Sequence, residues 1–469
     1  MHRRNDKAKR KDHRCSMSTK TFSQANDWLK KRLEGRDEFM GSRHSFFKIF
    51  QHGIVYSFLE IKNKKLKTFF HLPLFVQKLR WKLKSLLKSK AKSFQLNEIV
   101  MLDPGRVHID EDGNHTSAYF HKIQNTLPKS KYTSINENPQ HGLPCDYSLL
   151  DLDNLAFPSG DAIDKMLEEV NDVAKKLRNS DYYSAEEKEL IQSCLHLFLV
   201  SYIRYLSIFQ TSKIKKLFFI RHYHNEGIIA AANDCGIETI ELQHGLINKH
   251  DLYYVYDLAF KTNLKNAFFP NRILLFGQYW KDVLSKGAEW RSEQLIIAGD
   301  YMSSKKTEVQ EKAKQNVILI ASQKTLHGLF IPRIKELAAS LQNHPDWRII
   351  LKLHPFEKEI EKYNDLASDK LEIAPLQSSI SDYLEISKIQ VSIYSTTFFD
   401  AIGKNVVNFA WTGNFLGGDY AEALIEDGIA KSANNEDIIL IFNKMNLESK
   451  SPLERPHFYT TFSSESFDV

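Results

Sequence analysis

Residues 243–245 of the sequence, Gln243-His244-Gly245, have the side chains and the position expected of a reaction centre. They follow the strand-like run 239–242 directly. In an open parallel sheet the carboxyl ends of the strands form the crevice where ligands bind. An imidazole titrates near neutral pH, so we predict that His244 is a general base, with a hydrogen bond to a substrate as the alternative role. Gln243 and Gly245 are its predicted supports, with Gly245 letting the backbone turn closely.

Two later stretches share the pattern of a buried strand followed at once by hydrogen-bonding residues. They are LKLHPFE at 351–357 and IYSTTFFDAIGK at 393–404, and each is predicted to lead into a helix. The unpaired N–H groups and positive dipole of a helix N-terminus bind phosphate, and Pro suits a first helical turn. The ordinary alternative for a Ser or Thr before a helix is a simple N-cap. The predicted phosphate-binding residues are Lys352, His354, Pro355, Ser395, Thr396 and Thr397.

The segment RHYHNEG at 221–227 supplies further candidates. Glu226 follows a strand end at the start of a predicted helix, which makes it a second candidate base. The alternative is a helix-start carboxylate that the helix dipole favours. Arg221, His222 and His224 would add positive charge for an anionic substrate.

The acidic pairs of the sequence do not indicate a catalytic metal. Asp110 and Asp112, like Asp151 and Asp153, fall in a loop-rich region away from the predicted crevice. The four cysteines contain no CxxC pair, which argues against a zinc site and against a disulfide framework. We therefore expect no metal ion and no cofactor.

The elements that must position these side chains alternate along the chain. Helical patterns at 160–178 and 184–209 follow a Pro- and Gly-rich stretch at 101–160, which is predicted to be mostly loop. Strand-like runs then occur at 216–220, 239–242, 272–276, 295–299, 316–321, 347–353, 371–374, 389–394 and 405–410, with helical patterns in most of the intervals. Strands that alternate with helices predict parallel sheets covered on both faces.

The length of 469 residues predicts more than one hydrophobic core. We expect an α/β protein with two doubly wound, Rossmann-like domains that face a cleft, joined by a charged linker at 303–315. The expected units are a basic N-terminal extension at 1–100, a first domain at 101–302, a second domain at 316–450 and a tail at 451–469.

Charge is distributed unevenly along the chain. Residues 1–100 hold 25 Lys and Arg against 8 Asp and Glu, whereas the remainder holds 39 against 50. Residues 1–20 are predicted to be disordered, and residues 60–93 read as a basic amphipathic helix suited to an anionic membrane surface. The alternative is a helix that packs on the protein body. We find no base-reading motif for nucleic acid, no signal peptide and no run of about 18 apolar residues.

Residues 210–445 resemble GT-B glycosyltransferases of bacterial surface-glycan assembly. The likeness lies in the ordered motifs IELQHG, YYVYDLAF, RILLFGQYW, LIIAGDY, LKLHP and YSTTFFDAIGKNVV. Capsular polysaccharide biosynthesis proteins have similar motifs, as do, more distantly, polyol-phosphate transferases that use CDP-glycerol.

The resemblance implies a metal-independent glycosyltransferase with a nucleotide-sugar donor and a glycan or lipid-linked acceptor. It would place His354 and the run 395–397 on the donor phosphates and His244 across the cleft. Its expected location is cytoplasmic, peripheral at the inner face of the membrane. Two alternatives remain open: a nucleotide-sugar epimerase and a non-catalytic partner in a glycan-assembly complex.

Overall fold

The fold is that of a computed structural model, which describes residues 20–59, 96–109, 113–138, 143–149, 158, 160–302, 313–323, 326–355, 357, 359–376, 378–433, 438–448 and 455–467. The predicted disorder at 1–19, the predicted helix at 60–93 and most of the predicted linker at 303–315 lie outside these residues. The two acidic pairs lie outside them as well.

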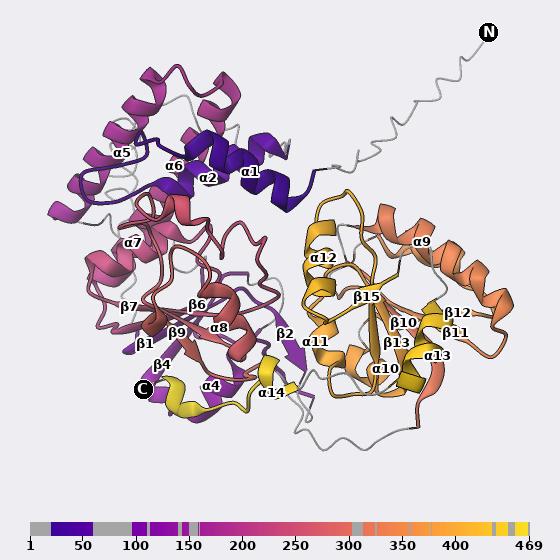
Figure 1. The fold of residues 1–469 in the computed structure, drawn as a ribbon. Helices are drawn as coiled ribbons and strands as arrows, with labels where there is room; N and C mark the ends of the chain where they lie inside the picture. Colours follow the sequence, from indigo (N-terminus) through magenta and orange to yellow (C-terminus); the bar gives the residue numbers. More distant parts are fainter. Residues whose placement is uncertain are drawn as a thin grey trace, which may run out of the picture.

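Two parallel sheets organise the chain, and Figure 1 shows them side by side, the first in purple to rose and the second in orange to yellow. The expected α/β class with two Rossmann-like sheets is confirmed. In spatial order the first sheet contains β5 (Tyr147–Ser148), β4 (Tyr132–Asn136), β1 (Ile99–Asp103), β6 (Lys216–Ile220), β7 (Glu238–Leu242), β8 (Arg272–Leu275) and β9 (Leu295–Ile297). The second contains β12 (Leu371–Ile373), β11 (Arg348–Lys352), β10 (Gln315–Ala321), β13 (Ser387–Ser392), β14 (Val407–Ala410) and β15 (Lys431–Ser432).

The central strands are nearly continuous apolar runs because helices cover both faces of each sheet. Leu217 to Ile220 of β6 and Val317 to Ala321 of β10 are buried throughout. The covering helices are α4 (His121–Thr126), α5 (Asp161–Asn179), α6 (Ala185–Gln210), α7 (Glu226–Asp234), α8 (Gln278–Leu284), α9 (His327–Ser340), α10 (Ile380–Ile386), α11 (Thr397–Ala401), α12 (Gly418–Glu426) and α13 (Ile438–Glu448). A small antiparallel pair, β2 (Val107–Ile109) and β3 (His115–Ser117), lies beside the first sheet.

The stretch 101–160 is more regular than the sequence indicates. It contains most of β1 and all of β4 and β5, which add three strands to the edge of the first sheet beyond β6. These strands are two to five residues long and are separated by Pro and Gly, so turn signals dominate the sequence pattern there.

Part of the predicted N-terminal extension belongs to the first domain. Helices α1 (Phe22–Leu33) and α2 (Phe47–Phe58) pack into the same core cluster as α5, α6 and α7. A capping box of Thr21 and Gln24 starts α1. Among the described helices, α6 is long and apolar enough to cross a membrane, but 72% of its apolar window is buried inside the protein. It packs against α2 and α7, as a core helix does.

The predicted tail also has a structural place. Helix α14 (Arg455–Phe458) contacts α8, and the backbone of Thr460 exchanges hydrogen bonds with Phe276 and Asp300 of the first domain. In Figure 1 this yellow segment lies against the first sheet, far from the rest of the yellow chain. The first domain is therefore completed by residues that follow the second domain in the sequence.

Candidate active site

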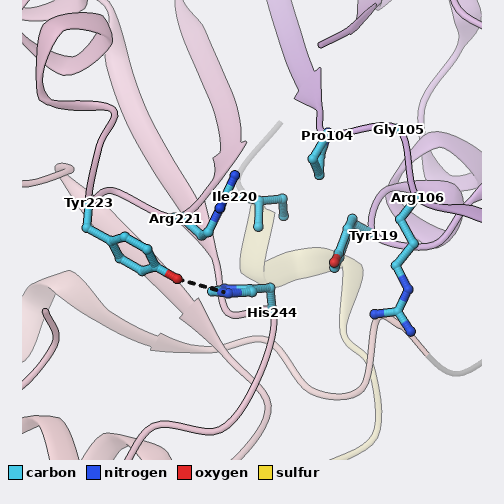
Figure 2. A pocket seen from close by; sticks show the side chains of 8 residues that line it. All are labelled: Pro104, Gly105, Arg106, Tyr119, Ile220, Arg221, Tyr223 and His244. Carbon is cyan, nitrogen blue, oxygen red and sulfur yellow. Dashed lines mark hydrogen bonds between the residues drawn. The ribbon is translucent and has the colours of Figure 1, made fainter. Parts of the chain in front are cut away.

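A cavity of about 270 Å³ lies at the carboxyl ends of β1, β6 and β7. From β1 the chain continues to β4 on one side, whereas from β6 it continues to β7 on the other, so the cavity marks the switch point of the sheet. Ligands bind at such switch points in open α/β sheets. Figure 2 shows the lining residues, which are Pro104, Gly105, Arg106, Tyr119, Ile220, Arg221, Tyr223 and His244.

The imidazole of His244 is the proton-transfer group of this cavity. Burial lowers the pKa of His244 to about 4; Glu241 opposes this change, while Arg221 and Arg106 add to it. The ring is therefore neutral at pH 7. Its Nε2 lies 3.5 Å from the hydroxyl of Tyr223, too far for a strong hydrogen bond, and its buried Nδ1 has no partner among the described residues. Nε2 is thus available to accept a proton from a ligand.

Glu241 lies on β7 beneath the cavity and is fully buried. Its carboxylate oxygen Oε2 is 2.6 Å from His222 Nδ1, and the other oxygen, Oε1, accepts a hydrogen bond from the hydroxyl of Tyr254. Burial by itself would raise the pKa of Glu241, but His222 and Tyr254 outweigh it and hold the pKa below its ordinary value. His222 Nε2 is 2.8 Å from the carbonyl of Tyr253. Both ring nitrogens of His222 are thus engaged, and burial lowers its pKa, so this residue has a structural role in place of the predicted positive charge for an anionic substrate.

Glu226, the second predicted base, is buried against the N-terminal helix α2. Its Oε1 is 2.8 Å from His52 Nε2 and 3.6 Å from Lys48 Nζ. Burial opposes ionisation, but His52 and Lys48 outweigh it and depress the pKa of Glu226 far below its usual range. Glu226 does not line the cavity, whereas His244 does, and the carboxylate of Glu226 is engaged by His52 and Lys48. The geometry therefore favours His244 over Glu226.

His224 lies in the same cluster, away from the cavity lining. Its ring packs 4.2 Å from that of His52, and Tyr56 hydroxyl is 3.3 Å from its Nε2. Burial, followed by the charge of His52, lowers the pKa of His224 to about 3. The residue therefore brings no positive charge at neutral pH, contrary to the prediction from its type.

Gln243 and Gly245 differ in what they contribute. The buried Gln243 side chain donates from Nε2 to the carbonyl of Gly245 at 3.0 Å and accepts from the N–H of Phe276 at 3.0 Å. It thereby fixes the loop after β7 to the loop after β8. The predicted reason for Gly245 is wrong, because its φ is not positive and a Cβ would meet nothing within 4 Å.

In the second sheet, the predicted phosphate-binding residues lie at the carboxyl ends of neighbouring strands. The N–H of His354, after β11, donates to Ser322 Oγ after β10 at 3.0 Å. Gln323 Nε2 donates to the carbonyl of Tyr394 after β13 at 2.6 Å. These bonds tie together the strand ends around the switch point between β10 and β13.

The prediction of a helix directly after His354 is wrong. The next helical segment is a 3-10 turn, Ile360–Leu366, so Pro355 does not occupy a first helical turn. Lys352 is buried, and its Nζ donates to the carbonyls of Leu353 and Leu376 at 3.1 and 2.8 Å. Its ammonium group therefore stabilises the backbone here.

The run Ser395-Thr396-Thr397 begins α11, a helix of five residues. Ser395 Oγ accepts from the N–H of Thr397 at 3.2 Å and from its hydroxyl at 2.9 Å. Gln390 also donates to the hydroxyl of Thr397. Thr396 is the N-cap residue but makes no side-chain cap hydrogen bond. The hydroxyls of Ser395 and Thr397 are thus used to shape the turn.

Six cavity residues were not among the sequence candidates: Pro104, Gly105, Arg106, Tyr119, Ile220 and Tyr223. The run EIVMLDPGR at 98–106 carries a usable signal, since four apolar residues precede a Pro-Gly turn. That pattern is typical of a strand followed by a turn.

The carboxyl edges of the two sheets face each other. The loop after β7 reaches α12, which follows β14: Lys249 pairs with Glu426, and Tyr420 hydrogen-bonds Asp251. The rings of Tyr394, after β13, and Tyr420 lie 5.4 Å apart. The cavity and the switch point of the second sheet are therefore on facing sides of one domain contact.

No protein-family model and no curated protein matches the chain. Solved structures do resemble it at 10–12% identity. The UDP-GlcNAc 2-epimerase from Neisseria meningitidis bound to UDP-GlcNAc aligns with a TM-score of 0.45 at 12% identity, over 79% of this chain and 97% of that one. The spinosyn rhamnosyltransferase SpnG complexed with thymidine diphosphate gives 0.41 and 12%, over 75% and 91%. Likenesses at this level do not identify an activity.

Proposed function

We propose that the protein is a glycosyltransferase that moves a sugar from a nucleotide-activated donor to an acceptor hydroxyl. One observation carries this proposal: the cavity with the neutral His244 faces the switch point of a second parallel sheet. Two facing switch points suit two substrates that react with each other across a domain contact.

In the proposed reaction the acceptor oxygen attacks the anomeric carbon of the donor sugar. The bond from that carbon to the nucleotide phosphate breaks, and its electron pair leaves with the phosphate. His244 Nε2 accepts the proton of the acceptor hydroxyl, for which its neutral form at pH 7 is required. The nucleotide would lie at the ends of β10, β11 and β13, near His354 and Ser395.

The first test is a thermal-shift screen against CMP, CDP, UDP, GDP and ADP, because a ligand that binds the native state raises its apparent stability. We expect a shift with one nucleotide, lost in His354→Ala. The matched control is His344→Ala, a change elsewhere in the second domain. If no nucleotide binds and no transfer occurs to any acceptor, the proposal fails and a non-catalytic partner role gains support.

We propose further that the acceptor is a growing surface glycan or a lipid-linked precursor, used at the cytoplasmic face of the membrane. The support for this is the excess of basic residues in 1–100 and the amphipathic pattern at 60–93. A deletion of residues 1–95 is a poor test because it removes α1 and α2 from the core of the first domain.

A better test keeps the chain intact and neutralises Lys82, Lys84, Lys88 and Lys90 by substitution with Gln. We expect weaker co-sedimentation with anionic vesicles. The control variant carries the same change at four exposed lysines, Lys165, Lys175, Lys261 and Lys265. Equal loss in both variants would contradict a specific role for residues 60–93.

A further inference from the structure

We propose that the cavity of the first domain binds an oxyanion of the acceptor, a phosphate or a carboxylate, between Arg106 and Arg221. The assignment of this anion to the acceptor rests on the proposed function. The existence of the anion site does not depend on it. It names the chemical class of the second substrate: a sugar or lipid-linked sugar that carries a negative charge close to its reacting hydroxyl.

The cavity lining contains two arginines without an acidic partner among the residues that the structure describes. Arg106 and Arg221 both line the cavity, and within the described part of the chain no carboxylate lies within 4.0 Å of either guanidinium. Guanidinium groups bind phosphate and carboxylate through two parallel hydrogen bonds. Both arginines also lower the pKa of His244, which confirms that their charge acts on the cavity.

The nearby acids do not pair with either arginine. Asp103 accepts hydrogen bonds from the N–H of Gly105 and the hydroxyl of Ser117, and burial raises its pKa. Burial also raises the pKa of Glu137, although Arg221 opposes the change. Glu241 is bonded to His222 and Tyr254, and its charge acts on the pKa of His244 in the opposite direction to the arginines. Among the described residues, both guanidinium groups therefore keep their hydrogen-bond donors for an anionic ligand.

Both arginines are carried on fixed turns. Gly105 has a φ of +84°, and a Cβ there would lie 2.8 Å from Asn136 Oδ1, so the turn before Arg106 requires glycine. Arg221 itself has a φ of +68°, and its carbonyl accepts a hydrogen bond from Asn225 Nδ2 at 2.8 Å. A non-glycine residue held in this region is strained, and such strain clusters at ligand sites.

The size and shape of the cavity suit a small charged ligand. A volume of about 270 Å³ is slightly below the roughly 300–1,000 Å³ of pockets for drug-sized ligands. It suits one charged group with a single sugar ring better than a whole nucleotide. Figure 2 shows Tyr223 and Arg221 on one side of His244 and Tyr119 with Arg106 on the other. A ligand that lies between the two arginines would therefore lie beside the imidazole.

The test is isothermal titration of the full chain with three probes: glucose 1-phosphate, glucuronate and uncharged glucose. We expect at least one charged probe to bind and glucose not to bind. Arg106→Gln and Arg221→Gln should each lower the affinity for the charged probe at least tenfold. The control is Arg291→Gln, an exposed arginine of the same domain that pairs with Glu293. Tighter binding of glucose 1-phosphate would identify the anion as a phosphate, whereas tighter binding of glucuronate would identify it as a carboxylate.

The inference is overturned if both cavity variants bind the charged probes with wild-type affinity. It is also overturned if Arg291→Gln loses as much affinity as the cavity variants, or if glucose binds as tightly as the charged probes. Circular dichroism and thermal unfolding show whether each variant is folded, and Arg106→Lys provides a milder change should a Gln variant unfold. Nucleotide titrations on the same samples separate this inference from the proposed function. Anion binding that depends on the arginines, without any nucleotide binding, would uphold the anion site and reject the donor assignment.

Discussion

His244 shows how its surroundings set the protonation state of a candidate base. An exposed imidazole titrates near pH 6.5, whereas burial lowers the pKa of His244 to about 4. We predict that an NMR titration of the labelled ring shows no protonation between pH 8 and about pH 5. His244→Gln assigns the signal. A midpoint near 6.5 would mean that the cavity is open to water and that His244 does not have the proposed environment.

The Glu226 cluster leads to a prediction about stability. Lys48 is fully buried beside Glu226, and burial lowers its pKa to about 8 even though Glu226 opposes this. Glu226→Gln leaves the Lys48 ammonium without its counterion, so we expect a loss of about 3–5 kcal/mol in denaturant unfolding. The double variant with Lys48→Met should recover part of this loss, because the unpaired charge is gone.

The opposite pattern would restore Glu226 as the base. In that case Glu226→Gln would unfold at the wild-type denaturant concentration while transfer activity fell by orders of magnitude. His244→Gln, measured in parallel, would then keep most of its activity.

At the scale of elements, the alternation of strands and helices from 216 to 410 could be predicted because buried parallel strands are short apolar runs bounded by polar turns. Helix α2 could not be predicted this way. Its residues 47–55 are all buried, yet Lys48, Gln51 and His52 interrupt the apolar pattern. Each has a partner distant in the sequence, such as the carbonyl of Phe268 for Lys48, and one-dimensional patterns do not show such pairs.

The same reasoning applies to the site. His244 and Arg221 were found because each directly follows a strand that the sequence shows clearly. Arg106 follows β1, which is hidden in a Pro- and Gly-rich stretch, so half of the charged lining was missed. The helix predicted directly after His354 is wrong because the helical segment described there is a 3-10 helix that begins only at Ile360, although Pro355 is compatible with a helical turn.

The contact of the C-terminal segment with α8 gives an element-scale prediction. A Cβ at Gly277 would lie 2.5 Å from the carbonyl oxygen of Phe458. This oxygen belongs to the backbone, which cannot move aside as the end of a flexible side chain can. We expect Gly277→Ala to lower the free energy of unfolding by about 1–3 kcal/mol. Gly245→Ala is the control, since a Cβ there meets nothing. Equal unfolding midpoints for both variants would show that residues 455–467 do not hold this position in solution.

At the scale of the whole molecule, the domain contact contains a titratable group. Asp251 is 8% exposed, and burial raises its pKa to about 7, although hydrogen bonds from Tyr253 and Tyr420 oppose this. Its unfolded pKa is near 3.8, so folding favours the protonated form. The stability that this preference contributes is fully present below about pH 4 and is lost as the pH rises through 7.

Asp251→Asn removes the titratable carboxyl group, and with it the loss of stability as the pH rises. We predict that the variant matches the wild type in thermal unfolding at pH 4 and exceeds it at pH 8, with the difference growing between these values. Asp257→Asn is the control, because the hydrogen bonds from the N–H of Ala259 and from Lys30 hold the pKa of that carboxylate below its ordinary value. A constant difference at all pH values would show that Asp251 is not buried in the domain contact.

The position of residues 455–467 affects the order of events during synthesis. A ribosome releases the strands of the first sheet early, and N-terminal domains ordinarily fold as they emerge. Here the segment that covers Gly277 and bonds to Phe276 and Asp300 is translated after the entire second sheet. The domain that begins to fold first is therefore the one that is finished last, and until then it presents the uncovered faces of α8 and β9 to chaperones.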